Sequence, residues 1–276
     1  MYPILVTGGT GTLGRHVVRR LRDGGREVRV LSRRTGKDDT GLHFLTGDLL
    51  SSIGIAAAVD GVETIVHCAG SSKGDEVATK NLVEAAARKG RPHLVYVSVV
   101  GAERMPVSSS IDRLMFGYFE MKRKAEEVVA GSGLPWTTIR ATQFHDLVLT
   151  VAEVLAKLPN IPVPSGAAFQ PVEADEVAAR LVELSIGEPS GLVPEIAGPR
   201  VHTATELMRA YLRATHRHRV LLPVWLPGRA ARALRAGADL ARDDAVGKRT
   251  WEEFLADRLS RPSRRDLVTA RAPARS

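Results

Sequence analysis

Three side chains in the middle of the sequence have the types and spacing that carbonyl reduction requires. Tyr118 and Lys122 are four residues apart within a helical pattern, so they share one face of the predicted helix. A tyrosine hydroxyl can protonate a carbonyl oxygen, and a neighbouring ammonium group lowers its pKa toward neutrality. Ser98 ends a predicted strand, from which its hydroxyl can orient the same carbonyl. The three residues are our candidate catalytic site, although the same tyrosine–lysine spacing also arises by chance on many helices.

Hydride transfer to a carbonyl needs a nucleotide cofactor, and the start of the sequence predicts its site. Residues 4–6 are typical of a buried strand, residues 7–11 form a glycine-rich turn, and a helix is expected from Thr12 onward. The pattern G-x-x-G-x-x-G is supplied by Gly8, Gly11 and Gly14. Backbone N–H groups at a helix N-terminus attract a pyrophosphate, and glycines let it approach. The turn therefore predicts dinucleotide binding, with a merely structural turn as the alternative.

The residues at the end of the second predicted strand indicate which dinucleotide is bound. The strand Val28–Ser32 is followed by Arg33 and Arg34 rather than by an acid. An arginine cannot accept a hydrogen bond from the ribose 2′-hydroxyl of NAD(H), but it can pair with the 2′-phosphate of NADP(H). We therefore expect NADP(H) to be favoured over NAD(H), with Ser32 and the two arginines at its adenosine end. The alternative is a solvated arginine pair in a surface loop.

Two later turns offer further contacts to a cofactor. Asp48 and Leu49 follow a predicted strand at residues 43–46. The Asp48 carboxylate suits either the adenine amino group or the cap of a helix that starts near Ser51, and the sequence does not separate these roles. Ala69 and Gly70 follow a predicted strand at residues 64–68, and their small size lets the chain pass close to a cofactor.

Strands and helices alternate through the first half of the sequence. Further strands are expected at residues 93–99 and 136–140, and helices at 75–89 and 118–130, with an irregular segment at 101–116. This alternation predicts an α/β protein with a Rossmann-type doubly wound parallel sheet and a small C-terminal substrate lobe. We divide the chain into a NAD(P)-binding Rossmann domain (residues 1–145), a mixed segment that completes the sheet and forms the lobe (146–260), and a basic, disordered tail (261–276).

Composition narrows the class of protein. The 276 residues include 44% hydrophobic and 25% charged residues, which is ordinary for a globular protein. The single cysteine, Cys68, excludes a disulfide framework within the chain and favours a reducing compartment, so we expect a cytoplasmic protein. The most apolar helical stretch, residues 147–158, contains charged side chains and is too short to cross a bilayer, so no membrane association is expected.

The basic balance does not predict a nucleic-acid partner or a metal site. The net charge is +8, but the excess is partly local to the tail and no basic-aromatic motif accompanies it. His216 and His218 are two residues apart without further ligands beside them, so we predict no metal. The expected partner is a small-molecule substrate, bound by a monomer or a homodimer.

Several segments together resemble the short-chain dehydrogenase/reductase superfamily and, more narrowly, its atypical extended, NmrA-like branch. They are residues 6–14, 47–49, 95–98, 118–126 and 132–144. The resemblance implies that Ser98 and Tyr118 are catalytic. It also implies that the cofactor contacts four strand ends and one helix, through Gly8, Thr10, Gly11, Thr12, Leu13, Gly14, Arg33, Arg34, Asp48, Leu49, Ala69, Gly70 and Lys122.

The segment after the sixth predicted strand is expected to reach the substrate. Phe144 could pack on it and His145 could relay a proton, although the favoured interpretation of His145 is a surface histidine at a capped helix start. We therefore predict an NADPH-dependent reductase of a carbonyl or quinone-like small molecule. Two alternatives stay open. One is a NAD(P)H-binding sensor without turnover, which the resemblance allows, and the other is a sugar-nucleotide epimerase or dehydratase, which the arginine pair disfavours.

Overall fold

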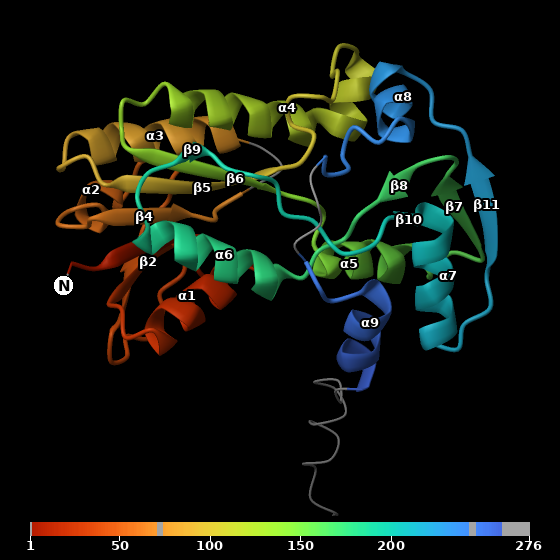
Figure 1. The fold of residues 1–276 in the computed structure, drawn as a ribbon, viewed down its shortest axis with the longest axis horizontal. Coiled ribbons are helices and arrows are strands. Elements are labelled where there is room, and N and C mark those ends of the chain that lie inside the picture. The colour runs from red at the N-terminus through yellow and green to blue at the C-terminus, as the bar shows by residue number, and fades with distance from the viewer. Residues whose placement is uncertain (1, 71–73, 243–246, 261–276) are drawn as a thin grey trace, which may run out of the picture.

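The computed structural model describes residues 2–70, 74–242 and 247–260. These residues form a central sheet with helices on both faces, and a second group of helices and short strands beyond one end of the sheet (Figure 1). The predicted disordered tail, residues 261–276, lies outside the described residues.

Seven parallel strands make the central sheet, in the order β3-β2-β1-β4-β5-β6-β9. The first six follow the strand order of the doubly wound dinucleotide-binding fold, which confirms the predicted fold class. Strand β9 comes from the second half of the chain and extends the sheet beyond β6. The strands span Ile4–Thr7 (β1), Val28–Ser32 (β2), Leu42–Thr46 (β3), Thr64–His67 (β4), His93–Val99 (β5), Trp136–Ala141 (β6) and Gly191–Leu192 (β9).

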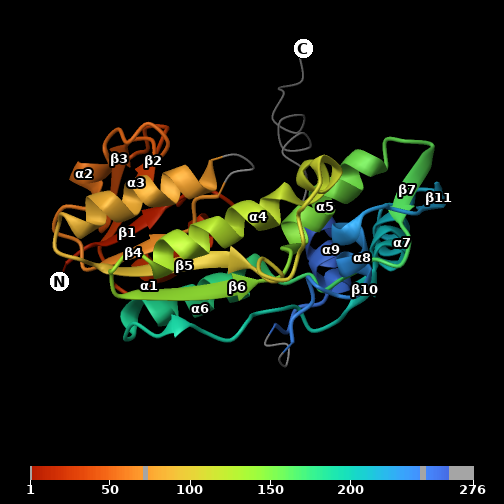
Figure 2. The same ribbon diagram turned by 90° about the horizontal axis from the view of Figure 1, so that it is seen from above.

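Five helices cover the two faces of this sheet. Helices α1 (Gly14–Asp23) and α6 (Ala174–Ile186) lie on one face, and α2 (Ile55–Ala58), α3 (Asp75–Ala87) and α4 (Ser110–Ala130) lie on the other (Figure 2). Side chains of β5 alternate between the two cores: Val95 and Val97 pack toward α1 and α6, while Leu94 and Tyr96 pack toward α2, α3 and α4. By the same alternation, Ser98 stands on the α4 side of the sheet.

The remaining elements form a lobe at the carboxyl end of the strands. Figure 2 shows β5 and β6 running toward this lobe. Its core contains residues of α5, α7 and α9, and β7 pairs in parallel with β11 at its outer side. Its elements are α5 (His145–Leu155), β7 (Asn160–Pro164), β8 (Ala168–Phe169), β10 (His202–Thr203), α7 (Ala204–Ala214), β11 (Val220–Val224), α8 (Arg229–Arg235) and α9 (Trp251–Ser260).

Helix α4 begins eight residues before the predicted start at Tyr118. Ser109 is its N-cap: the Ser109 hydroxyl accepts from the backbone N–H of Asp112, and Asp112 accepts in return from the backbone N–H of Ser109. This capping box satisfies two backbone groups at the helix start. The prediction of an irregular segment is confirmed for residues 101–109 and was wrong for residues 110–116, because the serine run supplies a cap.

His145 occupies the core of the lobe. Its ring is fully buried and stacks on Trp251 and Phe254, with ring centroids 5.8 and 5.1 Å away. Nε2 donates to the carbonyl of Arg249 across 3.2 Å. Burial lowers the pKa of His145 to about 4, so the ring is neutral at physiological pH. The expected surface position of this histidine is therefore wrong, and the aromatic packing leaves it no contact with a substrate.

The buried ring of His145 predicts a pH dependence of folding. Between pH 6.5, where an ordinary histidine protonates, and pH 4, the unfolded chain binds a proton at His145 that the folded protein does not. His145→Phe keeps the aromatic stack and removes this effect. The variant should therefore gain stability relative to the wild type as pH falls through this window, by up to about 3 kcal/mol. Urea denaturation at several pH values measures the difference, and a constant difference across the window would contradict the prediction.

Candidate active site

The turn between β1 and α1 requires glycine at two positions. Gly8 has φ +69°, and a Cβ there would lie 2.6 Å from the backbone nitrogen of Ala69. A Cβ on Gly14 would overlap the carbonyl oxygen of Gly8, so this glycine lets α1 start directly against the turn. The turn leaves Thr10 and Gly11 exposed. Their backbone lies at the N-terminal end of α1, where an anion is stabilised.

Two neighbours of this turn differ in what they present to a ligand. Thr12 is half-buried beside the exposed residues. The side chain of Leu13 is buried in the core beneath α1, so only its backbone could meet a phosphate.

The predicted adenosine end lies beside the glycine turn. Strand register pairs Thr7 with Leu31, which brings the residues after β2 next to Gly8. Ser32 accepts a hydrogen bond from the backbone N–H of Arg34 at 3.1 Å and shapes the bend. Arg33 and Arg34, which follow the strand, are both exposed.

Asp48 holds a turn rather than a helix cap. Its carboxylate accepts from the backbone N–H of Leu50 at 3.2 Å and from the hydroxyl of Ser51 at 3.3 Å. The helix-capping alternative is wrong, because α2 begins only at Ile55 after Gly54. The carbonyl of Leu49, in the same turn, accepts from the side-chain amide of Asn81 at 2.7 Å.

The segment after β4 connects the glycine turn to the predicted catalytic pair. Ala69 packs against Gly8, as described above. On the next residue, Gly70, a Cβ would lie 3.5 Å from Lys122 Nζ and 3.7 Å from Asp75 Oδ2. This strand end therefore lies between the glycine turn and the lysine.

Lys122 is buried, with 3% of its surface exposed, and its ammonium group has three partners. Nζ lies 3.1 Å from Asp75 Oδ2, 3.2 Å from the Tyr96 hydroxyl and 3.4 Å from the carbonyl oxygen of Val97. Burial opposes the charge, but attraction to Tyr96, Tyr118 and Asp75 outweighs it and raises the pKa of Lys122. The lysine is therefore held as a fixed cation behind the strand end.

Tyr118 lies one helical turn before Lys122 on α4. Lys122 Nζ is 5.9 Å from the centre of its ring, and 42% of the tyrosine surface is exposed. Loss of solvent raises the pKa of Tyr118, against an opposing effect of Lys122. The structure thus brings the predicted Tyr–Lys pair together on one helix face, with the tyrosine open to solvent and the lysine enclosed.

Ser98 and Tyr96 stand on the same face of β5. Ser98 is 2% exposed, and its hydroxyl has no hydrogen-bond partner among the described residues. Tyr96 is fully buried, and burial raises its pKa to about 12. The role of Tyr96 as a partner of Lys122 escaped the sequence analysis. The available signal was a tyrosine within the aliphatic stretch of residues 94–97 of this central strand.

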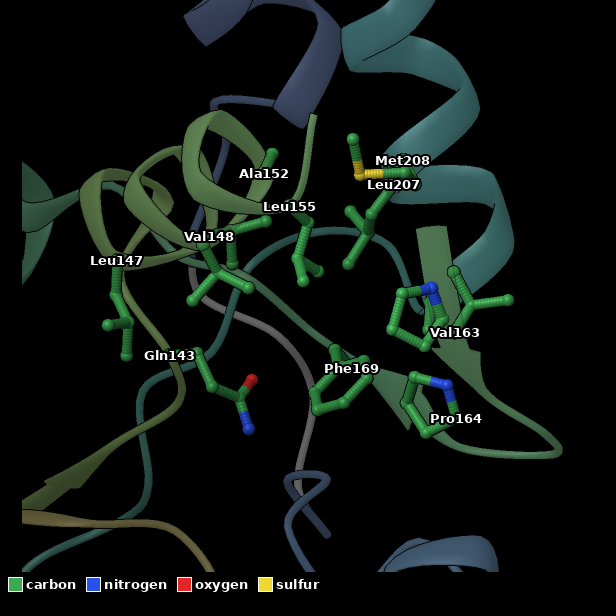
Figure 3. A pocket seen from close by; sticks show the side chains of 13 residues that line it. Gln143, Leu147, Val148, Ala152, Leu155, Val163, Pro164, Phe169, Leu207 and Met208 are labelled. Carbon is green, nitrogen blue, oxygen red and sulfur yellow. The ribbon is translucent and has the colours of Figure 1, made fainter. Parts of the chain in front are cut away.

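In the segment after β6, Gln143 faces a pocket, whereas the two residues predicted to reach the substrate, Phe144 and His145, do not. The Gln143 side chain lines a pocket between α5, β7, β8 and α7 (Figure 3). Phe144 packs against the core between the sheet and helices α1 and α6, and its backbone pairs with Val172. Neither Phe144 nor His145 lines this pocket.

Three further features of the described residues concern the Cys68 thiol, metal ligands and membrane-spanning helices. Burial raises the pKa of Cys68 to about 12, so the thiol is a poor nucleophile at neutral pH. Across residues 2–70, 74–242 and 247–260, no three His, Cys, Asp or Glu side chains are grouped to hold a metal ion. None of the helices in these ranges combines the length and apolarity needed to cross a membrane.

Comparison with known proteins places this geometry in a family. Residues 8–184 match the family of NAD(P)H-binding proteins. A (4-alkanoyl-5-oxo-2,5-dihydrofuran-3-yl)methyl phosphate reductase from Streptomyces griseus is 30% identical over 250 residues, covering 89% of this chain and 81% of that reductase. A ceramide reductase from Caulobacter vibrioides is 28% identical over 225 residues, covering 75% of this chain and 68% of that protein.

A solved structure has a fold similar to that of this chain. The NADPH-dependent quinone oxidoreductase from Escherichia coli, in complex with NADPH, has a TM-score of 0.73 at 19% identity, covering 93% of this chain and 100% of that one. The chain therefore belongs to the NAD(P)H-binding family and has the extended, NmrA-like fold of the short-chain dehydrogenase/reductase type.

Proposed function

We propose that this protein is an NADPH-dependent reductase of a carbonyl or quinone-like small molecule. One observation carries the proposal. The strand end at Ala69 and Gly70 lies against the glycine turn on one side, and a Cβ on Gly70 would come within 3.5 Å of Lys122 Nζ on the other, with Tyr118 one helical turn from that lysine. A cofactor lying on the turn and along this strand end would have its reactive end beside the Tyr–Lys pair.

The residues present fit NADPH. A Cβ on Gly8 or Gly14 would clash with nearby backbone atoms, so glycine at these positions allows the shape of the turn. The exposed backbone at Thr10 and Gly11 suits a pyrophosphate. Arg33 and Arg34 would hold the 2′-phosphate by charge-assisted hydrogen bonds. Lys122 would hold the nicotinamide ribose, and the turn at Asp48 and Leu49 would flank the adenine.

The chain would supply the proton and the orientation for carbonyl reduction. When bound, NADPH supplies a hydride. Tyr118 donates its hydroxyl proton to the carbonyl oxygen, which becomes an alcohol, and the tyrosine regains a proton from solvent before the next turnover. Lys122 stabilises the resulting phenolate. Ser98, whose buried hydroxyl has no partner in the described residues, donates a hydrogen bond that orients the same oxygen.

The relatives support a carbonyl-bearing substrate. The Streptomyces griseus reductase acts on a furanone that carries an oxo group and an alkanoyl group, and the Escherichia coli neighbour is a quinone oxidoreductase. Carbonyl groups are common to these compounds. We therefore place the substrate of this protein in the same chemical class.

Removal of the Arg33 guanidinium should separate the two dinucleotides. Arg33→Ala is expected to weaken NADPH binding roughly 10- to 100-fold and to leave NADH binding unchanged, because only NADPH carries the 2′-phosphate. Fluorescence titration of both cofactors measures this. Lys37→Ala, which removes the same charge from an exposed position four residues away, is the matched control. Equal losses for NADPH and NADH, or equal effects of the two variants, would contradict the assignment.

Loss of the Tyr118 hydroxyl should abolish the chemical step without affecting cofactor binding. Tyr118→Phe is expected to lower kcat for a carbonyl substrate by about a hundredfold or more, with the NADPH dissociation constant unchanged. NADPH oxidation with a panel of ketones, aldehydes and quinones provides the assay. A wild-type protein that binds NADPH tightly and oxidises it with none of the panel would favour the sensor function instead.

The Asp75 carboxylate should set the pH range of the reaction. Its negative charge raises the pKa of Tyr118, in addition to the larger effect of lost solvent. Asp75→Asn lowers this pKa, so the tyrosine loses its proton at lower pH. The alkaline fall in kcat/KM should therefore move to lower pH. Glu76→Gln, which removes an exposed acid from the next residue, is the control. If the alkaline fall in kcat/KM occurs at the same pH in Asp75→Asn, while NADPH still binds, the proposed effect of Asp75 on Tyr118 is refuted.

A further inference from the structure

A pocket between α5, β7, β8 and α7 is almost wholly apolar. Its cavity volume is about 190 Å³, and the side chains of all four elements converge on it (Figure 3). The walls include Val148, Leu155, Val163, Phe169 and Met208. Of the described residues that line it, none is charged and Gln143 alone has a polar side chain.

The pocket starts at the carboxyl edge of the sheet, near the candidate catalytic strand. Arg140 of β6 is the register partner of Ser98 on β5. Gln143 follows three residues after Arg140, where the chain leaves β6 and enters α5. Ligands of open α/β sheets bind outside this edge. A substrate at Ser98 and Tyr118 could therefore extend into the pocket past Gln143.

The amide of Gln143 is fixed by partners behind it. Its Nε2 donates to Asp239 Oδ2 at 2.7 Å, and its Oε1 accepts from the backbone N–H of Gln170 at 3.4 Å. Asp239 is 1% exposed. A side-chain amide nitrogen carries two hydrogens, and in the described residues Asp239 is the one acceptor recorded for them. Within the described residues the second N–H has no acceptor, so it can donate to a ligand.

Two aliphatic side chains of the pocket wall are unusually exposed. Leu147 and Val151, one turn apart on α5, have 55% and 49% of their surface in contact with solvent. Their exposure leaves this wall of the pocket open to solvent. A hydrocarbon chain laid along this wall would remove them from water.

We propose that the pocket binds a hydrocarbon chain of the substrate, and that the second N–H of Gln143 donates to a substrate oxygen at the head of that chain, apart from the carbonyl held by Tyr118 and Ser98. The inference rests on the proposed reductase function and adds the substrate class: a carbonyl compound with an alkyl tail. A sugar nucleotide does not suit this wall, because none of its described lining residues could pair with a phosphate or a set of hydroxyl groups.

The direct test is binding of a homologous series of methyl ketones, from butanone to decanone. Isothermal titration calorimetry on the full chain, with and without saturating NADP⁺, gives a dissociation constant for each ketone. Each added methylene should tighten binding about fourfold until the pocket is filled. The slope of affinity against chain length then reports the pocket itself.

Two variants on α5 provide a matched pair. Val151→Asp places a charge on the pocket wall and should flatten the chain-length slope. Val154→Asp places the same charge on the same helix, at a residue that is 56% exposed and does not line the pocket, and should leave the slope intact. Circular dichroism melting of each variant verifies that it is folded.

A third variant tests the head contact separately. Gln143→Met should weaken every member of a matching series of 2,4-diketones, which carry a second oxygen beside the carbonyl held by Tyr118 and Ser98, by the same factor, about tenfold, and leave the slope unchanged, because only the hydrogen bond to that second oxygen is lost. A change of slope without a change at the shortest diketone would overturn the assignment of Gln143.

The same series separates this inference from the proposed function. An affinity that does not depend on chain length, or a slope that is unchanged in Val151→Asp, overturns the proposal that the pocket binds the hydrocarbon chain. Chain-length-dependent binding without NADPH oxidation by any ketone or quinone supports the pocket and counts against the reductase. NADPH oxidation with a kcat/KM that does not depend on chain length supports the proposed reductase activity and overturns the proposed role of the pocket.

Discussion

The buried charge of Lys122 is the constraint on which the centre of the molecule depends. A lone ammonium group at this depth would cost several kcal/mol, so partners must be delivered to it from other elements. Asp75 comes from the first turn of α3 and Tyr96 from β5, while α4 carries the lysine itself. Helices α3 and α4 pack against each other beside the sheet. The pairing thus fixes α4 on the sheet and, with it, Tyr118 one turn earlier.

This pairing has a consequence for the proposed chemistry. The ion pair with Asp75 partly cancels the field of Lys122 at Tyr118, and loss of solvent outweighs what remains, so the pKa of Tyr118 is raised rather than lowered. A tyrosine that keeps its proton at neutral pH is suited to donate it, which is what reduction requires. The same arrangement disfavours the reverse direction, in which the tyrosine would act as a base.

The lobe is tied to the catalytic edge through the loop after β5. Arg104 of that loop donates to the carbonyls of Ala238 and Leu240, both at 2.9 Å, on either side of the residue that holds Gln143. Arg140, at the end of β6, binds Glu126 of α4 through two hydrogen bonds of 2.9 and 2.6 Å. These partly buried contacts connect the pocket, the sheet edge and the helix that carries Tyr118. The substrate pocket and the proton donor therefore belong to one connected framework.

The sequence by itself determined the features that depend on neighbouring residues. It predicted β2 and β5 with their observed bounds, and the glycine turn whose close contacts the structure shows, because periodicity and backbone clashes are local. It also placed Tyr118 and Lys122 on one helix face. Tertiary structure alone decided the partners of Lys122, the burial of His145 and the exposure of Gln143 to the pocket. Each of these depends on how segments far apart in sequence pack, and a residue's neighbours in the chain carry no record of that packing.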